Sequence, residues 1–145
     1  MKKILILIAL TSLTLPGKNM VGKWKSDTTQ SVSKLEILDS RGKAIVMDDS
    51  LQHFVNIEIL TPYSFKAYES SRSSLRGTCE WTVEGNAHQV QDTLFLTGMS
   101  VSLSQTEYDI PLNCKNFWNY ILCKKKKTLK QCGKGGGQLV FKKSK

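Results

Sequence analysis

Four cysteines are the residues of this chain with the most definite chemistry. They are Cys79, Cys114, Cys123 and Cys132, and all of them follow an apolar N-terminal segment. An even number of cysteines in an exported protein predicts disulfide bonds, here two of them. Three pairings are possible. We favour a bond from Cys79 to one of the other three, with the remaining two closing a short local loop.

Metal binding and catalysis are both disfavoured by the residues available. The last three cysteines are separated by eight residues each time, unlike the closely paired cysteines of zinc sites. The only histidines, His53 and His88, are distant in sequence from every cysteine and lie in no recognisable catalytic motif. A serine or cysteine nucleophile needs such a base within hydrogen-bond reach. The sequence therefore predicts no metal site, no cofactor and no enzyme activity.

A cluster of lysines near the C-terminus is the most distinctive surface feature. The run Lys124, Lys125, Lys126 and Lys127 begins a stretch of 22 residues that holds nine lysines, close to the aromatic residues 117, 118 and 120. Such a patch fits anionic lipid headgroups, at about 1 kcal/mol per lysine near a charged surface, or an acidic protein. Nucleic acid is disfavoured outside the cytosol. A plain solvated surface remains the alternative.

The N-terminus has the pattern of a secretory signal. Lys2 and Lys3 precede an uncharged apolar run, residues 4–10, which fades into a polar stretch ending at Pro16 and Gly17. We predict a signal peptide over residues 1–17 and a single domain over 18–145, secreted or periplasmic. Of the formal net charge of +9, +7 remains once the two leader lysines are removed.

Short segments of alternating polar and apolar residues indicate an all-β domain. Turn residues separate these segments, and Asp48 to Ser50 and Gly85-Asn86 are taken as two such turns. No alternation of strands with helices is visible, which favours an antiparallel meander closed as a small barrel or folded as a sandwich. The strands are expected at residues 23–27, 34–38, 44–47, 53–60, 64–69, 78–84, 93–96, 101–104, 108–110 and 138–142.

The region from Cys114 to Leu129 lacks this alternation of polar and apolar residues. Apolar residues at 117, 118, 121 and 122 have helical spacing, and the lysine run follows them. We therefore expect a short helix or an ordered loop here, before the last strand. The glycine-rich run 133–137 lacks the ending of a phosphate-binding loop and reads as a linker.

Three stretches together resemble small bacterial lipocalin-like domains. They are the Gly22-x-Trp24 opening, the run from Trp81 to Asn86 followed by Asp92 to Thr97, and the final strand Leu139 to Lys142. The resemblance implies a small β-barrel whose mouth holds one apolar ligand. Its lining would then include Trp24, Phe65, Trp81 and Phe95, although aromatic residues at alternating strand positions also suit a plain core.

Two classes of function remain open from the sequence. The first is a barrel that binds a small apolar molecule or a lipid. The second is a secreted interaction protein, of the inhibitor or immunity type, that acts through its basic, disulfide-braced C-terminal region. A large internal cavity would favour the first, and a filled barrel with a rigid C-terminal loop would favour the second. The oligomeric state is left open.

Overall fold

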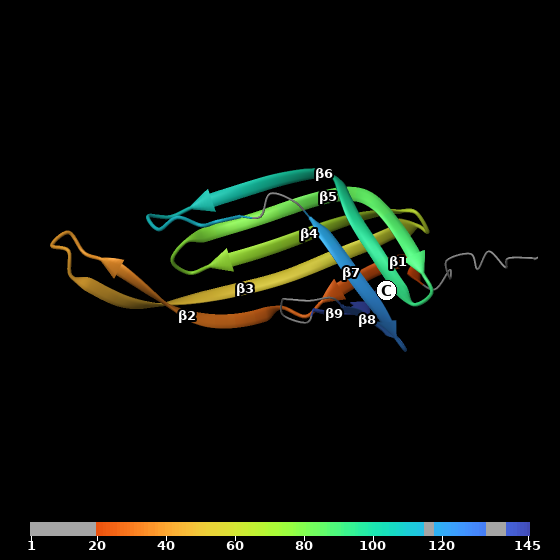
Figure 1. Ribbon diagram of the computed structural model, residues 1–145, viewed down its shortest axis with the longest axis horizontal. Helices are drawn as coiled ribbons and strands as arrows, with labels where there is room; N and C mark the ends of the chain where they lie inside the picture. Colours follow the sequence, from red (N-terminus) through yellow and green to blue (C-terminus); the bar gives the residue numbers. More distant parts are fainter. Residues whose placement is uncertain (1–19, 115–117, 133–138) are drawn as a thin grey trace, which may run out of the picture.

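The computed structural model describes residues 20–114, 118–132 and 139–145, and these form an antiparallel β-barrel with one additional strand (Figure 1). The predicted signal peptide lies outside the described residues. From β2 to β9 each strand pairs with its neighbour in sequence, so this part of the chain is a meander. The strands are β1 (Gly22–Ser26), β2 (Thr29–Leu38), β3 (Ala44–Thr61), β4 (Ser64–Ser73), β5 (Gly77–Val90), β6 (Thr93–Glu107), β7 (Asn119–Lys125), β8 (Thr128–Gln131) and β9 (Val140–Lys143).

The barrel closes because β3 has two partners along one edge. Its C-terminal half, Asn56 to Ile59, pairs with β1, and its N-terminal half, Ala44 to His53, pairs with β2. At the junction Ser26 Oγ accepts a hydrogen bond of 2.8 Å from the N–H of Val55. Strand β1 also pairs with β9, so eight strands form a closed ring and β2 lies outside it.

Alternating inward side chains fill the ring. In neighbouring strands, Trp24, Ile57, Ala67 and Val83 lie in one row, and each is at most 6% exposed. The outward residues between them are charged or polar, as expected for a sheet with one solvated face. Trp24 donates a hydrogen bond of 2.8 Å from Nε1 to the carbonyl of Met20, and this places the indole at one end of the core.

Two glycines allow the backbone to follow this path. Gly85 lies opposite a bulge in β6, where Met99 is the extra residue, and a Cβ atom on Gly85 would lie 2.0 Å from the carbonyl oxygen of Thr97. The bulge bends β6 and increases its twist beside β5. Gly22 has a φ of 130°, which only glycine adopts readily, at the entry to β1. The Gly22-x-Trp24 pattern thus has a local structural reason.

Several strands are longer than the sequence predicts. Asp48 to Ser50 was expected to end a strand, but β3 runs through it because Asp49 is buried and satisfied by the β4–β5 turn. Gly85-Asn86 was expected to be a turn, but both residues are paired inside β5, opposite a bulge in β6. The segments 93–96 and 101–104 are one strand, β6, and residues 108–110 are not a strand.

The expected helix or loop before the last strand is wrong for the described part of that region. Residues 119–131 form the β7–β8 hairpin, with Lys126 in the turn at a φ of 52°. Tyr120 and Leu122 point inward, whereas Asn119 and Ile121 point outward. Apolar residues at 118, 121 and 122 fit a helix equally well in isolation. Pairing with β6 at Thr93 to Thr97 supplies the hydrogen bonds that select the strand.

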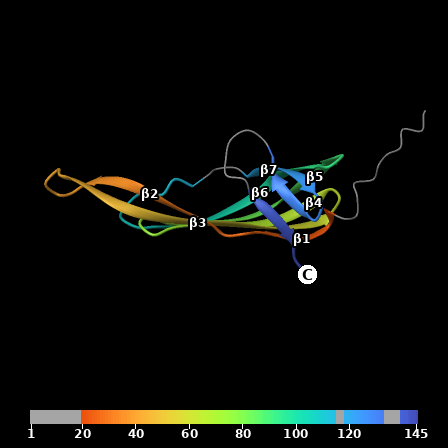
Figure 2. The same cartoon turned by 90° about the horizontal axis from the view of Figure 1, so that it is seen from below.

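The β2–β3 hairpin extends from the barrel as an arm (Figures 1 and 2). We call residues 29–50 the arm. Residues Ala44 to Ser50 of β3 pair with β2 alone, because β4 reaches only to Leu51. Its exposed apolar side chains are Val32, Leu38, Ile45, Val46 and Met47. The second half of β6 is likewise paired only with β5 among the described strands.

Candidate functional site

The barrel interior is filled by side chains where the resemblance predicts a ligand. Trp24, Phe65 and Trp81 are all at most 4% exposed and belong to one core cluster with Phe141 and Leu122. Phe95 does not join them. It points out of the barrel and is 37% exposed, because its neighbours Leu94 and Leu96 take the inward positions. The four aromatic residues therefore do not surround a common space.

A buried carboxylate lies among the core residues. Glu69 is 2% exposed, and its Oε1 lies 2.7 Å from His53 Nε2 and 3.1 Å from the hydroxyl of Tyr120, which donates to it. Trp118 Nε1 donates to the other oxygen. Burial, reinforced by the charge of Glu69, raises the pKa of Tyr120, so this hydroxyl stays protonated and remains a donor. The site holds β3, β4 and β7 together through satisfied hydrogen bonds.

Stacked rings surround this carboxylate. The Trp118 ring lies 5.3 Å from the Phe65 ring and 4.5 Å from the Tyr120 ring, measured between centroids. His53 is bound to Glu69 and 22% exposed, and His88 packs against Phe95 on the outer surface. Within residues 20–114, 118–132 and 139–145, no hydrogen bond joins either histidine ring to a serine or cysteine side chain. Among the described residues, no group of histidine, cysteine and acidic side chains is arranged to hold a metal ion.

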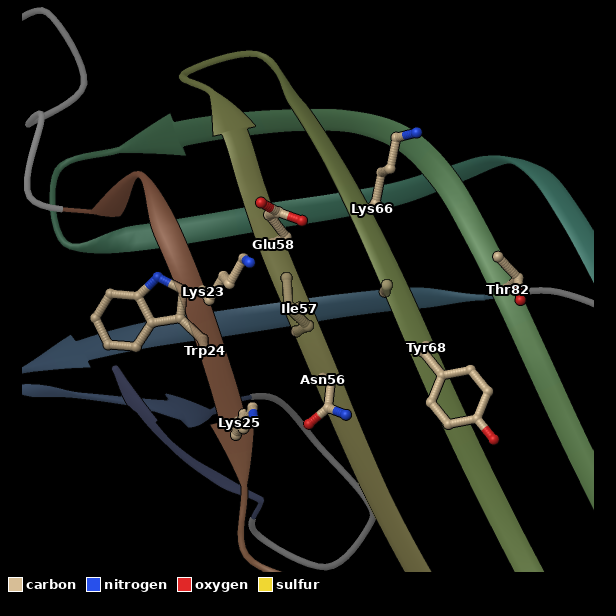
Figure 3. A pocket seen from close by; sticks show the side chains of 10 residues that line it. Lys23, Trp24, Lys25, Asn56, Ile57, Glu58, Lys66, Tyr68 and Thr82 are labelled. Carbon is tan, nitrogen blue, oxygen red and sulfur yellow. The ribbon is translucent and has the colours of Figure 1, made fainter. Parts of the chain in front are cut away.

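A groove with a volume of about 290 Å³ lies on the outer surface of β1, β3, β4 and β5 (Figure 3). Lys23, Glu58 and Lys66 form one row of outward side chains, and Lys25, Asn56, Tyr68 and Thr82 form the next. A hydrogen bond from Lys66 to Glu84 raises the pKa of Lys66, so the ammonium stays charged. Burial, and then a hydrogen bond to Glu80, raises the pKa of Tyr68. The groove therefore presents cations and neutral polar groups together with one carboxylate, Glu58.

Charge is divided unevenly between the two parts of the sheet. The described residues on and around β1, β7, β8 and β9 carry ten lysines, no arginine and a single acidic residue, Asp27. Residues 28–114 carry six basic and eleven acidic residues. The two parts thus have formal charges of +9 and −5. We call the first set the lysine wall: Lys23, Lys25, Lys124, Lys125, Lys126, Lys127, Lys130, Lys142, Lys143 and Lys145.

Disulfides fix the position of the lysine run. Cys123 on β7 is bonded to Cys132, which follows β8, and Cys79 is bonded to Cys114. This confirms the favoured arrangement, in which Cys79 makes the longer connection and the other pair closes a local loop. Lys124 to Lys127 lie inside that loop, at the turn of the β7–β8 hairpin. The predicted basic patch is therefore a braced hairpin tip.

A second buried carboxylate anchors the base of the arm. Asp49 is fully buried, and it accepts hydrogen bonds of 2.6 Å from the Ser73 hydroxyl and 2.9 Å from Arg76 Nε. Burial acts to raise the pKa of Asp49. The hydrogen bonds from Ser73, Leu75 and Arg76, with the charge of Arg76, outweigh burial and hold the pKa below its ordinary value. These contacts tie the arm to the β4–β5 turn.

Two disulfide bonds indicate an oxidising environment, outside the cell or in the periplasm. The described chain contains no helix of the length and apolar character needed to cross a bilayer. No protein-family model, curated protein or solved structure matches this chain. The barrel fold is compatible with small-molecule binding. A more specific function has to be inferred from the side chains on the surface.

Proposed function

We propose that this protein is an exported interaction protein, without catalytic activity, that binds a polyanionic partner through the lysine wall. The proposal rests on the uneven division of charge. The described residues on and around β1, β7, β8 and β9 have a formal charge of +9, and residues 28–114 have a formal charge of −5. A strongly basic surface of this size attracts and orients an anionic partner over distances near the Debye length, about 10 Å at moderate salt.

The packed core supports this proposal over binding in the interior. Trp24, Phe65 and Trp81 are at most 4% exposed and belong to one cluster of buried core side chains. The braced β7–β8 hairpin supports it further. The Cys123–Cys132 bond holds the lysine run in one backbone conformation, and little conformational entropy is lost when a partner is bound.

Small-molecule binding by a lipocalin-like barrel is the second candidate function, and the outer groove is the observation in its favour. Its volume of about 290 Å³ is at the lower limit of ligand pockets. The lining combines three lysines and the carboxylate of Glu58 with apolar residues, so a ligand here would carry charged groups as well as an apolar part. A groove of this composition lies next to the lysine wall and shares two of its residues.

Affinity for a polyanion tests the proposal. The oxidised protein is applied to immobilised heparin and eluted with increasing salt. A wall variant carries Lys125→Glu, Lys126→Glu and Lys127→Glu. A matched arm variant carries Lys34→Glu, Arg41→Glu and Lys43→Glu, which changes the net charge by the same amount. All six side chains are exposed.

We expect the wild-type protein and the arm variant to elute at similar high salt and the wall variant at much lower salt. Equal shifts in both variants would mean that only net charge matters, and the proposal would be wrong. Passage of the wild-type protein through the column without binding would also overturn it.

A further inference from the structure

We infer that the polyanionic partner is the surface of an anionic phospholipid bilayer, and that the protein docks on it with one face of β6, β7 and β8 and the adjoining end of β5. This inference rests on the proposed function and names the partner class for the same basic region. We call the face the docking face and define it by Val90, Phe95, Ile121, Lys125, Lys126, Lys127 and Lys130.

Three exposed apolar side chains lie together at the centre of this face. Phe95 on β6 is directly opposite Ile121 on β7, and they are 37% and 41% exposed. Val90, in the adjoining row on β5, is 50% exposed. All three occupy outward positions, where a solvated sheet normally carries polar residues. A patch of this kind, bordered by charged groups, is typical of an interaction surface.

Lysines border the apolar group on the side of the β7–β8 hairpin. Lys130 is opposite Cys123, one row from Ile121, and Lys125 is opposite Thr128 in the next row. Lys126 and Lys127 extend the series at the turn. The segments Thr93 to Thr97 and Trp118 to Gln131 carry five lysines and no acidic residue. The nearest acidic residue along the chain is Asp92, in the β5–β6 turn, whose carbonyl accepts the N–H of Lys124.

The identity of the basic residues favours a lipid surface over an acidic protein. Every cation of the lysine wall is a lysine, and the three arginines of the chain lie elsewhere, at 41, 72 and 76. Arginine is enriched in protein interfaces because its planar group binds carboxylates in a fixed geometry, whereas lysine is depleted there. The ammonium group of lysine is a point charge on a flexible side chain, which suits mobile lipid headgroups. Each lysine near an anionic leaflet adds to the attraction between the protein and the membrane.

The two kinds of side chain have different roles in this arrangement. The lysines draw the face to the headgroup layer, where Phe95 and Ile121 enter the boundary between headgroups and acyl chains. The strands of the barrel and the Cys123–Cys132 bond keep the apolar and basic rows in register. Phe95 and Ile121 lie on β6 and β7, and the lysines lie on the β7–β8 hairpin. These strands are neighbours, so both kinds of side chain reach the membrane surface together.

Co-sedimentation with vesicles tests the inference. The full oxidised protein is mixed with vesicles of phosphatidylcholine alone, or of phosphatidylcholine with phosphatidylglycerol. We expect binding only to the anionic vesicles, and loss of binding at high salt. The double variant Phe95→Ser and Ile121→Thr should lower partitioning roughly tenfold, the effect of losing burial of two partly exposed apolar groups. It should leave elution from heparin unchanged.

The matched control is Val32→Ser with Leu38→Thr, on the arm, where both residues are more than 60% exposed. This control should bind vesicles as the wild-type protein does. A second measurement uses Phe95→Trp, which preserves an aromatic side chain. Its emission should shift to shorter wavelength with anionic vesicles and remain unshifted with neutral ones.

The outcomes separate this inference from the proposed function. Binding to heparin without binding to anionic vesicles would overturn the lipid assignment and leave the polyanion proposal standing. Vesicle binding that is unaffected by loss of Phe95 and Ile121, or that is lost equally in the arm control, would overturn the docking face. Failure to bind heparin as well would overturn both.

Discussion

The indole of Trp118 donates a hydrogen bond to the carboxylate of Glu69, 49 residues earlier in the chain. The bond crosses the barrel interior from the start of β7 to β4. Since β7 carries the lysine run at its far end, the buried carboxylate helps to fix the strand on which the proposed binding surface is built.

Replacing Glu69 should destabilise the barrel severely. In Glu69→Leu, the buried donors of Trp118 and Tyr120 lose their acceptor, and we expect the free energy of unfolding to fall by about 3 kcal/mol. Urea unfolding followed by tryptophan fluorescence measures this change. Glu84→Leu is the control, because Glu84 forms an exposed ion pair with Lys66 and its loss should have no measurable effect. Similar stabilities of the two variants would contradict a structural role for Glu69.

Stability should depend on the ionisation of Asp49 at acid pH. The pKa of Asp49 is lower in the folded state than its ordinary value of 3.8, so the unfolded chain takes up this proton first as the pH falls. The contribution of Asp49 is therefore complete well above pH 3.8 and declines until the pH passes below the folded-state pKa.

Urea midpoints measured over a series of acid pH values follow this decline. Asp49→Asn should be less stable than the wild-type protein at neutral pH and should lose part of its acid dependence. Asp48→Asn, at the exposed neighbouring position, should behave as the wild-type protein does. If the stability of Asp49→Asn and of the wild-type protein depended on pH in parallel, ionisation of Asp49 beside Arg76 would not be a source of the acid dependence.

The two disulfides should contribute differently to stability and to binding. They close loops with sequence separations of 35 and 9 residues, for which loop-closure entropy gives about 4 and about 3 kcal/mol. Serine replacement of Cys79 and Cys114 should therefore lower stability more. Replacement of Cys123 and Cys132 should weaken heparin and vesicle binding more, because it frees the β7–β8 hairpin. The reverse order of binding effects would argue against a braced binding surface.

Hydrogen exchange should distinguish the two halves of β3. Amides from Ala44 to Met47 pair only with β2, whereas those from Asn56 to Ile59 lie between β1 and β4 in the closed barrel. We expect the first group to exchange much faster, because a two-stranded arm opens without unfolding the core. Exchange measured by mass spectrometry on overlapping peptides tests this within a single strand. Equal protection along β3 would mean that the arm is held by contacts beyond its own ladder.

The sequence by itself determined the local features of this protein. Alternating residues specified the strand class and agree with the buried positions of Trp24 and Trp81, because a period of two is fixed by the pleat of a strand. The sequence also predicted the general arrangement of the disulfides, in which Cys79 is bonded to one of the three later cysteines and the other two are bonded to each other. The concentration of lysine at residues 124–127 was also visible directly.

The tertiary structure decided everything that depends on which strands are neighbours. It placed Asp49 and Gly85, which were expected in turns, inside β3 and β5. Arg76 binds the buried carboxylate of Asp49, and Gly85 pairs with β6 beside a bulge in that strand. It placed Phe95 outside the barrel, beside Ile121. It also gathered the lysines of β1 with those of β7 to β9, because barrel closure pairs β1 with β9, and no local pattern encodes that contact.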